Sequence, residues 1–249
     1  MRRPPPAPVV RYGGHPDQLA ILHLPAADPP FAAVALLHGG FWRDRWDRTL
    51  MTPLAHDLVS RGLAAWNVEY RRAGQEGGGW PGTLADVGAA LERLAAAPEV
   101  DPSRIVAVGH SAGGQLALWA AAQRTQLRLA GVVALAALCD LERARELDAA
   151  AVEAFLGGPP ETVPERYAEA SPRSLLPLGV PQVLVHGALD EIVPARLSEE
   201  YAEAARAAGD EVELVVVAGA DHFDVIDPGH EAWRVAVERI ERLLARDAG

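Results

Sequence analysis

The sequence has almost no cysteine. Cys139 is the single cysteine among 249 residues, which excludes an internal disulfide and any zinc site built from cysteines. Such a chain suits a reducing compartment, so we expect a cytoplasmic protein. The chain has no uninterrupted apolar run of membrane-spanning length. Four of residues 4–8 are prolines, where a signal peptide would carry its apolar region, and we expect residues 1–8 to form a disordered leader.

Positive charge is also scarce, and lysine is absent. The chain has 23 basic and 34 acidic side chains, so its formal net charge is −11. Nucleic acids and anionic membranes bind proteins through basic surfaces. We therefore expect neither as a partner, and a small-molecule substrate instead. The oligomeric state stays open at this point.

Apolar residues make up 49% of the chain, enough for one large core, and we expect a single domain over residues 1–249. An antiparallel start is expected, followed by strands that alternate with helices and form a mostly parallel sheet covered on both faces. The expected strands are Val9–Tyr12, Leu19–Leu24, Ala33–Leu37, Ala64–Val68, Ile105–Val108, Gly131–Leu138, Val183–His186 and Val212–Val217. The expected helices are Leu50–Arg61, Thr83–Ala97, Gln115–Ala122, Pro194–Ala208 and Ala232–Ala245.

Residues 139–181 interrupt this alternation. They include an expected helix over Ala149–Leu156 but no strand of their own. A long segment of this kind between two core strands is more often a functional lid than a linker. We therefore expect a short cap-like insertion.

The segment Gly109–Gly113, with the sequence GHSAG, lies between an expected strand and an expected helix. A serine on such a turn occupies a nucleophile elbow, which lifts its hydroxyl above the sheet and needs glycines where a Cβ would collide. Ser111 is therefore the candidate nucleophile. The pentapeptide alone is weak evidence, because glycine and alanine are abundant in this chain.

A serine hydroxyl needs a histidine base, and the histidine needs a carboxylate that fixes its tautomer. Among eight histidines, His222 alone follows the last expected strand on a glycine-containing loop, which makes it the candidate base rather than a solvated loop residue. The candidate acid is Asp190, directly after the preceding strand. Its plainer interpretation is a turn or helix-capping aspartate, and Glu191 is the nearest rival.

The loop after the first central strand reads His38-Gly39-Gly40-Phe41-Trp42. Its glycines allow the backbone N–H groups of Gly40 and Phe41 to join that of Ala112 in an oxyanion hole; a plain strand-end turn would also explain the glycines. Aromatic residues are candidates for the wall of the substrate pocket, although aromatics are more often core. These are Phe41, Trp42, Tyr70, Trp80 and Phe155.

Together these motifs resemble the α/β-hydrolase superfamily, and most of all its kynurenine formamidase and small carboxylesterase branch. The resemblance rests on the HGGFW loop, the GHSAGG elbow, Asp190 and the His222-Phe223 pair. It implies an α/β-hydrolase fold and a Ser-His-Asp hydrolase that uses no metal and no organic cofactor.

The leading hypothesis is therefore a serine hydrolase that cleaves a small carboxylic ester or activated amide through an acyl-enzyme. A kynurenine formamidase, which hydrolyses the amide of N-formylkynurenine, is the alternative enzyme. A peptidase fits less well, because such relatives usually carry a large extra domain. A non-catalytic ligand-binding protein with a hydrolase fold is the alternative of another class.

Overall fold

The computed structural model describes residues 7–123 and 127–246. Its centre is one sheet with the strand order β1-β2-β4-β3-β5-β6-β7-β8. The strands β1 and β2 run antiparallel to each other, β2 runs antiparallel to β4, and all later pairs are parallel. The strands are β1 (Val9–Arg11), β2 (Leu19–His23), β3 (Phe31–Leu37), β4 (Ala64–Val68), β5 (Val100–His110), β6 (Gly131–Leu135), β7 (Gln182–Gly187) and β8 (Val212–Val217).

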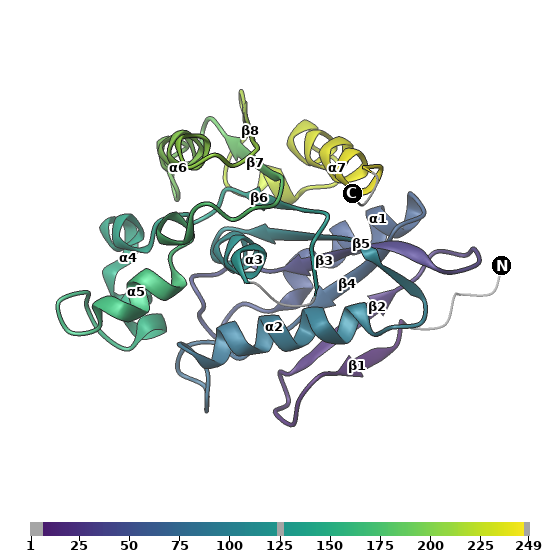
Figure 1. The fold of residues 1–249 in the computed structure, drawn as a ribbon, viewed down its shortest axis with the longest axis horizontal. Coiled ribbons are helices and arrows are strands. Elements are labelled where there is room, and N and C mark those ends of the chain that lie inside the picture. Colours follow the sequence, from purple (N-terminus) through teal and green to yellow (C-terminus); the bar gives the residue numbers. More distant parts are fainter. Residues whose placement is uncertain (1–6, 124–126, 247–249) are drawn as a thin grey trace.

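Helices cover both faces of the sheet (Figure 1). The α-helices are α1 (Thr52–Ser60), α2 (Gly82–Ala95), α3 (Ala112–Ala122), α4 (Leu141–Leu156), α5 (Pro164–Ala170), α6 (Arg196–Ala207) and α7 (Glu231–Leu244). The short 3₁₀ helices are η1 (Arg48–Met51), η2 (Pro172–Leu175) and η3 (Asp224–Ile226). This is the predicted α/β-hydrolase fold.

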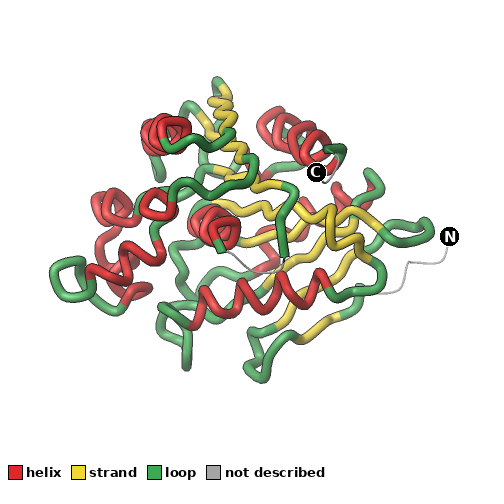
Figure 2. The backbone as a smooth tube through the Cα atoms, in the orientation of Figure 1, coloured by secondary structure: helices red, strands yellow, loops and turns green. Residues whose placement is uncertain are grey.

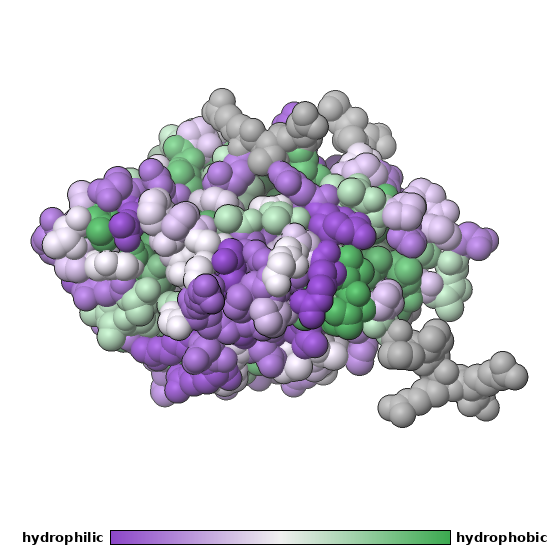
Figure 3. All heavy atoms as spheres, turned by 90° about the horizontal axis from the view of Figure 1, so that it is seen from below, coloured by the Kyte–Doolittle hydropathy of each residue, from purple (hydrophilic) through white to green (hydrophobic). Residues whose placement is uncertain are grey.

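Two apolar cores lie on opposite faces of the sheet because successive strand residues point to opposite sides. One core joins the sheet to α2, α3 and α6 and includes Leu116 and Tyr201. The other joins it to α1 and α7 and includes Leu58 and Trp233. The face seen in Figure 3 is largely hydrophilic, and hydrophobic residues appear on it in separate patches. Among the described helices, none is long and apolar enough to cross a membrane.

Several element bounds differ from those expected, each for a local reason. The helix expected from Leu50 begins as η1, because the Asp47 carboxylate caps that 3₁₀ turn, and continues as α1. The strand β6 ends at Leu135 rather than Leu138, because Ala136 takes the left-handed conformation with a φ of 46°. Of the leader expected at residues 1–8, residues 1–6 lie outside the described part of the chain. Pro8 belongs to the sheet region, since its carbonyl accepts a hydrogen bond from the Leu22 N–H (3.2 Å).

The segment 139–181 holds α4, α5 and η2 joined by loops, and Figure 2 shows no strand in this region. The helix α4 is interrupted by a kink at Asp148, whose φ of −156° and ψ of 85° are not helical. The Asp148 carboxylate accepts the Ala151 N–H (3.0 Å) and so caps the second half, Ala149–Leu156, which is the helix that the sequence predicts. The first half was not predicted. This first half begins after Asp140, whose carboxylate caps it, and it is rich in charged residues.

Candidate active site

Ser111 stands at the sharp turn between β5 and α3. Its backbone is in an unusual region, with φ 54° and ψ −118°, and its side chain is almost fully buried. A Cβ on Gly109 would overlap the carbonyl oxygen of Gly113, and a Cβ on Gly113 would overlap that of Leu37 at the end of β3. Strain of this kind persists only where the surroundings enforce it, and it is typical of active sites. The turn therefore has the geometry of a nucleophile elbow.

Asp190 and His222 meet although 32 positions separate them in the chain. Asp190 follows β7 and His222 follows β8, and these strands pair in parallel, so both loops leave the same edge of the sheet. The Nδ1–H of His222 donates to Oδ2 of Asp190 at 2.6 Å. The other oxygen, Oδ1, accepts the N–H groups of Ile192 (2.9 Å) and Val193 (2.8 Å). Asp190 therefore also acts as a turn aspartate that accepts backbone N–H groups, which is the plainer role considered for it above.

Burial alone would raise the pKa of Asp190. The hydrogen bonds from His186 and His222, with the backbone N–H of Val193, outweigh that cost and hold its pKa well below the usual range. Asp190 is consequently a carboxylate at neutral pH. Because the Asp190 carboxylate can only accept a hydrogen bond, the proton of the neutral His222 imidazole lies on Nδ1. The Nε2 nitrogen then carries no proton and can accept one.

His186 is a second partner of the same carboxylate, and it is not among the site residues predicted from the sequence. Its Nε2 faces two acceptors, Oδ2 of Asp190 (3.1 Å) and the Val193 carbonyl (2.7 Å), so this nitrogen carries the proton. Its Nδ1 is 2.8 Å from the Ser198 hydroxyl. The side chain is fully buried. The sequence feature that points to this contact is the position of His186 at the end of a strand, four residues before Asp190.

His110 lies directly before Ser111 and lines the same cavity. Its Nε2–H donates to the backbone carbonyl of His222 (2.9 Å), and the two imidazole rings are 4.6 Å apart. Burial, followed by repulsion from His222 when that imidazole is protonated, lowers the pKa of His110 to about 3. His110 is therefore a neutral positioning group that holds the loop of His222. Its Nδ1 is buried and has no hydrogen-bond partner among residues 7–123 and 127–246.

The loop after β3 contains three successive residues with positive φ: Gly40 (110°), Phe41 (51°) and Trp42 (54°). The N–H groups of Gly40 and Phe41 have no hydrogen-bond acceptor within the described residues. As the first residue of α3, Ala112 likewise lacks an intrahelical acceptor for its N–H. Because β3 and β5 are parallel neighbours, with Leu37 opposite Gly109, this loop and the serine turn leave the same sheet edge. The loop can therefore offer free backbone donors beside Ser111.

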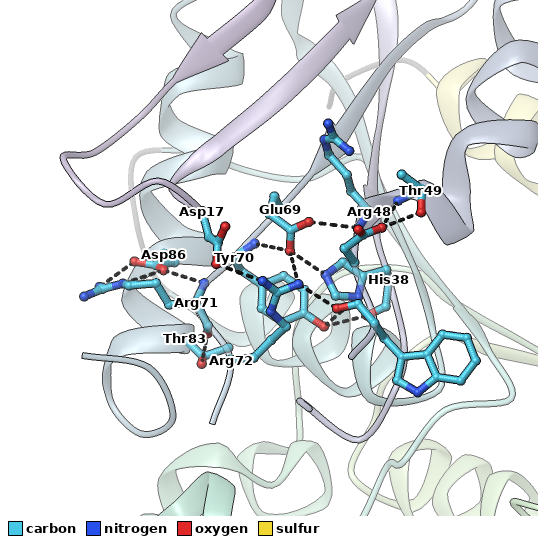
Figure 4. A network of polar contacts seen from close by, with 12 residues as sticks. Asp17, His38, Arg48, Thr49, Glu69, Tyr70, Arg71, Arg72, Thr83 and Asp86 are labelled. Atoms are coloured by element: carbon cyan, nitrogen blue, oxygen red, sulfur yellow. Dashed lines mark hydrogen bonds and ion pairs between the residues drawn. The ribbon is translucent and has the colours of Figure 1, made fainter. Parts of the chain in front are cut away.

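A chain of buried polar contacts lies beneath this loop (Figure 4). The Nε2–H of His38 donates to Glu69 (3.1 Å), and Arg72 binds both Glu69 (2.9 Å) and Asp17 (2.8 Å). The Tyr70 hydroxyl donates to the His38 carbonyl at 2.7 Å. These contacts fix the first residue of the loop to β4 and to the β1–β2 turn.

A cavity of about 250 Å³ contains the candidate catalytic groups. It is lined by residues of the loop after β3, the serine turn, α4 and the loops after β7 and β8. They are Gly40, Phe41, Arg43, Arg45, Trp46, Leu50, His110, Ser111, Asp148, Ile192, His222 and Phe223. The structure thus brings Ser111, His222, Gly40 and Phe41 to one cavity, with Asp190 behind His222.

Of the five aromatic residues predicted for the pocket wall, Phe41 lines this cavity, and the prediction is wrong for the other four. Trp42, Tyr70 and Phe155 have no exposed surface and belong to the core between the sheet, α3 and the insertion. Trp80 is half-buried under the Arg166 guanidinium, which is 4.6 Å from its ring centre. The wall is instead formed by Phe41, Trp46 and Phe223 with two arginines.

Thiol and metal chemistry have no built site in the described residues. Cys139 is buried, and burial raises the pKa of its thiol far above the usual range, so it stays protonated. No group of three or more histidine, cysteine, aspartate or glutamate side chains in residues 7–123 and 127–246 is arranged to hold a metal ion.

The sheet order, the serine turn and the loops around it define a protein of the α/β-hydrolase class. Comparison with known proteins gives the family. The prolyl oligopeptidase family matches residues 60–245, and the chain belongs to it. The uncharacterized protein Rv2307c of Mycobacterium tuberculosis is 30% identical over 204 residues, which cover 81% of this chain and 67% of that protein.

Solved structures show the same architecture. A truncated carbohydrate esterase from gut microbiota has a TM-score of 0.85 and 19% identity, covering 96% of this chain and 95% of the other. The propionate-bound esterase Est2 of the planctomycete Thermogutta terrifontis has a TM-score of 0.76 and 25% identity, covering 98% of this chain and 96% of that one. Both likenesses extend over nearly the whole chain.

Proposed function

We propose that this chain is a serine hydrolase that cleaves small carboxylic esters through an acyl-enzyme. The observation that carries the proposal is the arrangement around His222. Its Nδ1 binds the carboxylate of Asp190 (2.6 Å), and the residue lines the same cavity as Ser111. A carboxylate-oriented imidazole beside a serine on an elbow is the arrangement that serine hydrolases of unrelated folds share.

In this proposal the Ser111 hydroxyl attacks the ester carbonyl while the Nε2 of His222 takes its proton. Charge develops on the carbonyl oxygen, and the N–H groups of Gly40, Phe41 and Ala112 stabilise it. The alcohol then leaves with the proton from His222, and the acyl group remains on Ser111. A water molecule, deprotonated by His222, attacks this acyl group, releases the carboxylic acid and restores the serine.

The size of the cavity favours small substrates. Its volume of about 250 Å³ is below the range of about 300–1,000 Å³ that is common for small-molecule sites. The structural neighbour from Thermogutta terrifontis is an esterase with propionate bound, and this supports a short acyl group. The family name suggests a peptide substrate, so a proline-containing peptide belongs among the comparison substrates.

The finer choice between ester and formamide concerns the leaving group. The same catalytic groups act on either carbonyl, so N-formylkynurenine is the comparison substrate for the formamidase alternative. We expect higher kcat/KM for phenyl acetate than for N-formylkynurenine or for a proline-containing peptide anilide. A higher value for the formamide would replace the esterase proposal by the formamidase one.

Pre-steady-state hydrolysis of p-nitrophenyl acetate tests the mechanism. The wild-type protein should release a burst of p-nitrophenol, and acid-quenched protein should carry an acetyl group on Ser111 in peptide mass spectrometry. Ser111→Ala should lose the burst, whereas Ser60→Ala, an exposed serine at the end of α1, should keep it. A full burst in Ser111→Ala, or failure of a fluorophosphonate probe to label the wild-type protein, would overturn the proposal.

A further inference from the structure

Two arginine–aromatic pairs form one wall of the cavity, and both come from the loop after β3. The Arg43 guanidinium is 5.9 Å from the ring centre of Phe41, and that of Arg45 is 5.8 Å from the ring centre of Trp46. All four residues line the cavity that contains Ser111. A guanidinium over an aromatic face is held by the ring quadrupole. The wall is therefore positively charged although the whole chain is acidic.

The charge of Arg43 is already neutralised. Its Nη2 is 2.6 Å from Oδ2 of Asp148, at the kink of α4, and Asp148 lines the same cavity. The pair therefore contributes no net charge to the wall. It also leaves Asp148 unable to repel an anion with its full charge.

The charge of Arg45 has no such partner. Within the part of the chain that the structure describes, its guanidinium forms no hydrogen bond and no ion pair. Of the acids beside it in sequence, Asp44 lies outside the cavity lining, and Asp47 is engaged with Thr49 as the cap of η1. The chain has 34 acidic side chains for 23 basic ones, so a cation without a carboxylate at this cavity is notable.

Apart from Arg43, Arg45, Asp148, His110 and the candidate catalytic groups, the cavity lining is apolar. It includes Leu50, Ile192 and Phe223, and Ile192 and Phe223 keep 41% and 44% of their surface exposed. The Asp190 carboxylate does not line the cavity, lies behind His222 and is held by hydrogen bonds. A ligand that complements this cavity therefore has an apolar part that contacts the apolar side chains and one anionic group that pairs with Arg45.

We propose that Arg45 binds a carboxylate on the substrate, so that the preferred substrates are small esters that carry a carboxylate group. This inference rests on the proposed esterase function and names its substrate class. The planar guanidinium matches a carboxylate with two parallel N–H donors. The bound carboxylate stays ionised and takes no part in acyl transfer. Its role is to orient the ester carbonyl toward Ser111.

Matched pairs of esters test the proposal. The first pair is 4-carboxyphenyl acetate and 4-carbamoylphenyl acetate, which differ in charge on the leaving group. The second pair is the phenyl monoester of glutaric acid and the phenyl ester of its monoamide, which differ in charge on the acyl group. The readout is the ratio of kcat/KM for the charged ester to that for the neutral ester of the same pair.

Arg45→Gln should lower this ratio by about tenfold in at least one pair, as expected for loss of a charge-assisted contact, and Arg45→Glu should lower it further. The control Arg93→Gln removes an exposed arginine of α2, away from the cavity, and should keep the wild-type ratio. The double variant Arg43→Gln/Asp148→Asn removes the neutral ion pair as a whole and should change the ratio less than Arg45→Gln. The proposal is overturned if Arg45→Gln leaves both ratios unchanged, or if the double variant lowers them equally.

A binding measurement separates this proposal from the catalytic one. Calorimetry on the Ser111→Ala protein compares 4-acetamidobenzoate with 4-acetamidobenzamide, neither of which needs to react. The benzoate should bind more tightly, and adding Arg45→Gln should remove the preference. If wild-type protein hydrolyses no ester but this preference appears, the function proposal fails and the anion site stands. Equal binding of both ligands would remove the anion site.

Discussion

The indole ring of Trp42 stacks on the phenyl ring of Phe155, with ring centres 4.3 Å apart and planes 6° from parallel. The stack joins the loop after β3 to the second half of α4. The Trp42 Nε1–H also donates to Oε1 of Gln115 (3.1 Å), and the Gln115 amide donates to the Ala170 carbonyl (2.8 Å). The insertion at residues 139–181 is therefore fastened to the loop that carries the proposed oxyanion donors. This anchoring offsets the left-handed backbone of Phe41 and Trp42, a strain of about 1–3 kcal/mol per residue.

Trp42→Phe should slow the reaction more than it weakens substrate binding. Phenylalanine keeps the stack on Phe155 but leaves Oε1 of Gln115 without a donor, which costs about 1–3 kcal/mol of folding free energy. We expect kcat for p-nitrophenyl acetate to fall roughly tenfold, with a smaller change in KM, because a loosened loop displaces donors that act in the transition state.

Trp119→Phe is the matched control for that change. Trp119 also donates its indole N–H, to the Glu169 carbonyl (3.1 Å), but it lies on α3 and not in the loop after β3. Its kcat should stay within about twofold of wild type. Equal losses of kcat in both variants would mean that Trp42 acts only through general stability.

Asp190→Asn should abolish most activity without unfolding the protein. An amide NH₂ facing the Nδ1 of His222 would favour the wrong tautomer, and such a change lowers kcat by about 10⁴-fold in a serine protease. The control is Glu191→Gln, an exposed neighbour. Steady-state kinetics with far-UV circular dichroism measures both. Full activity in Asp190→Asn with none in Glu191→Gln would move the acid to Glu191.

His110 should make the protein less stable as pH falls. Because its pKa is lowered to about 3 in the folded state, mainly by burial, the folded protein keeps it neutral while the unfolded chain binds a proton below about pH 6.5. Folding stability then decreases between about pH 6.5 and 3, by at most about 1.4 kcal/mol per pH unit. His110→Gln should flatten this part of the stability curve in urea unfolding. Parallel curves for the two proteins would show that His110 does not cause the loss.

Gly113→Ala should destabilise the fold strongly. Its Cβ would overlap the carbonyl oxygens of Leu37 and His38, which are backbone atoms at the end of a central strand. We expect a loss of more than about 4 kcal/mol, or no folded protein at all. Gly88→Ala in α2 is the control, because a Cβ there meets nothing within 4 Å and alanine favours a helix by up to about 1 kcal/mol. A Gly113→Ala protein as stable as wild type in urea would contradict the close packing of the elbow.

Much of the fold follows from local sequence patterns. The strands β4 and β8 have the predicted bounds, because each is an apolar run that begins shortly after a glycine turn. Each proposed triad residue was predicted from its place after a strand, and the structure puts Asp190 and His222 in contact. Parallel strands bring their carboxyl ends together, so chain order alone carries this information.

Other features depend on contacts that the chain order does not encode. Phe41 and Trp42 are adjacent and both aromatic, yet one lines the cavity and the other is core, because two successive left-handed residues turn their side chains apart. The contact of His186 with Asp190 is a tertiary detail of the same kind. The kink of α4 at Asp148 forms where the carboxylate caps the second half and meets Arg43.

The buried contacts that run from Asp17 through Arg72 and Glu69 to His38 give the first hairpin a role beyond the edge of the sheet. Anyone who shortens this protein for crystallisation or for fusion to another enzyme would be tempted to remove the residues before β2. Such a deletion would take away Asp17 and leave the Arg72 cation buried with one carboxylate fewer. The shortened protein would still purify well but would turn over substrate slowly, because the affected loop lies after β3 and not at the deletion.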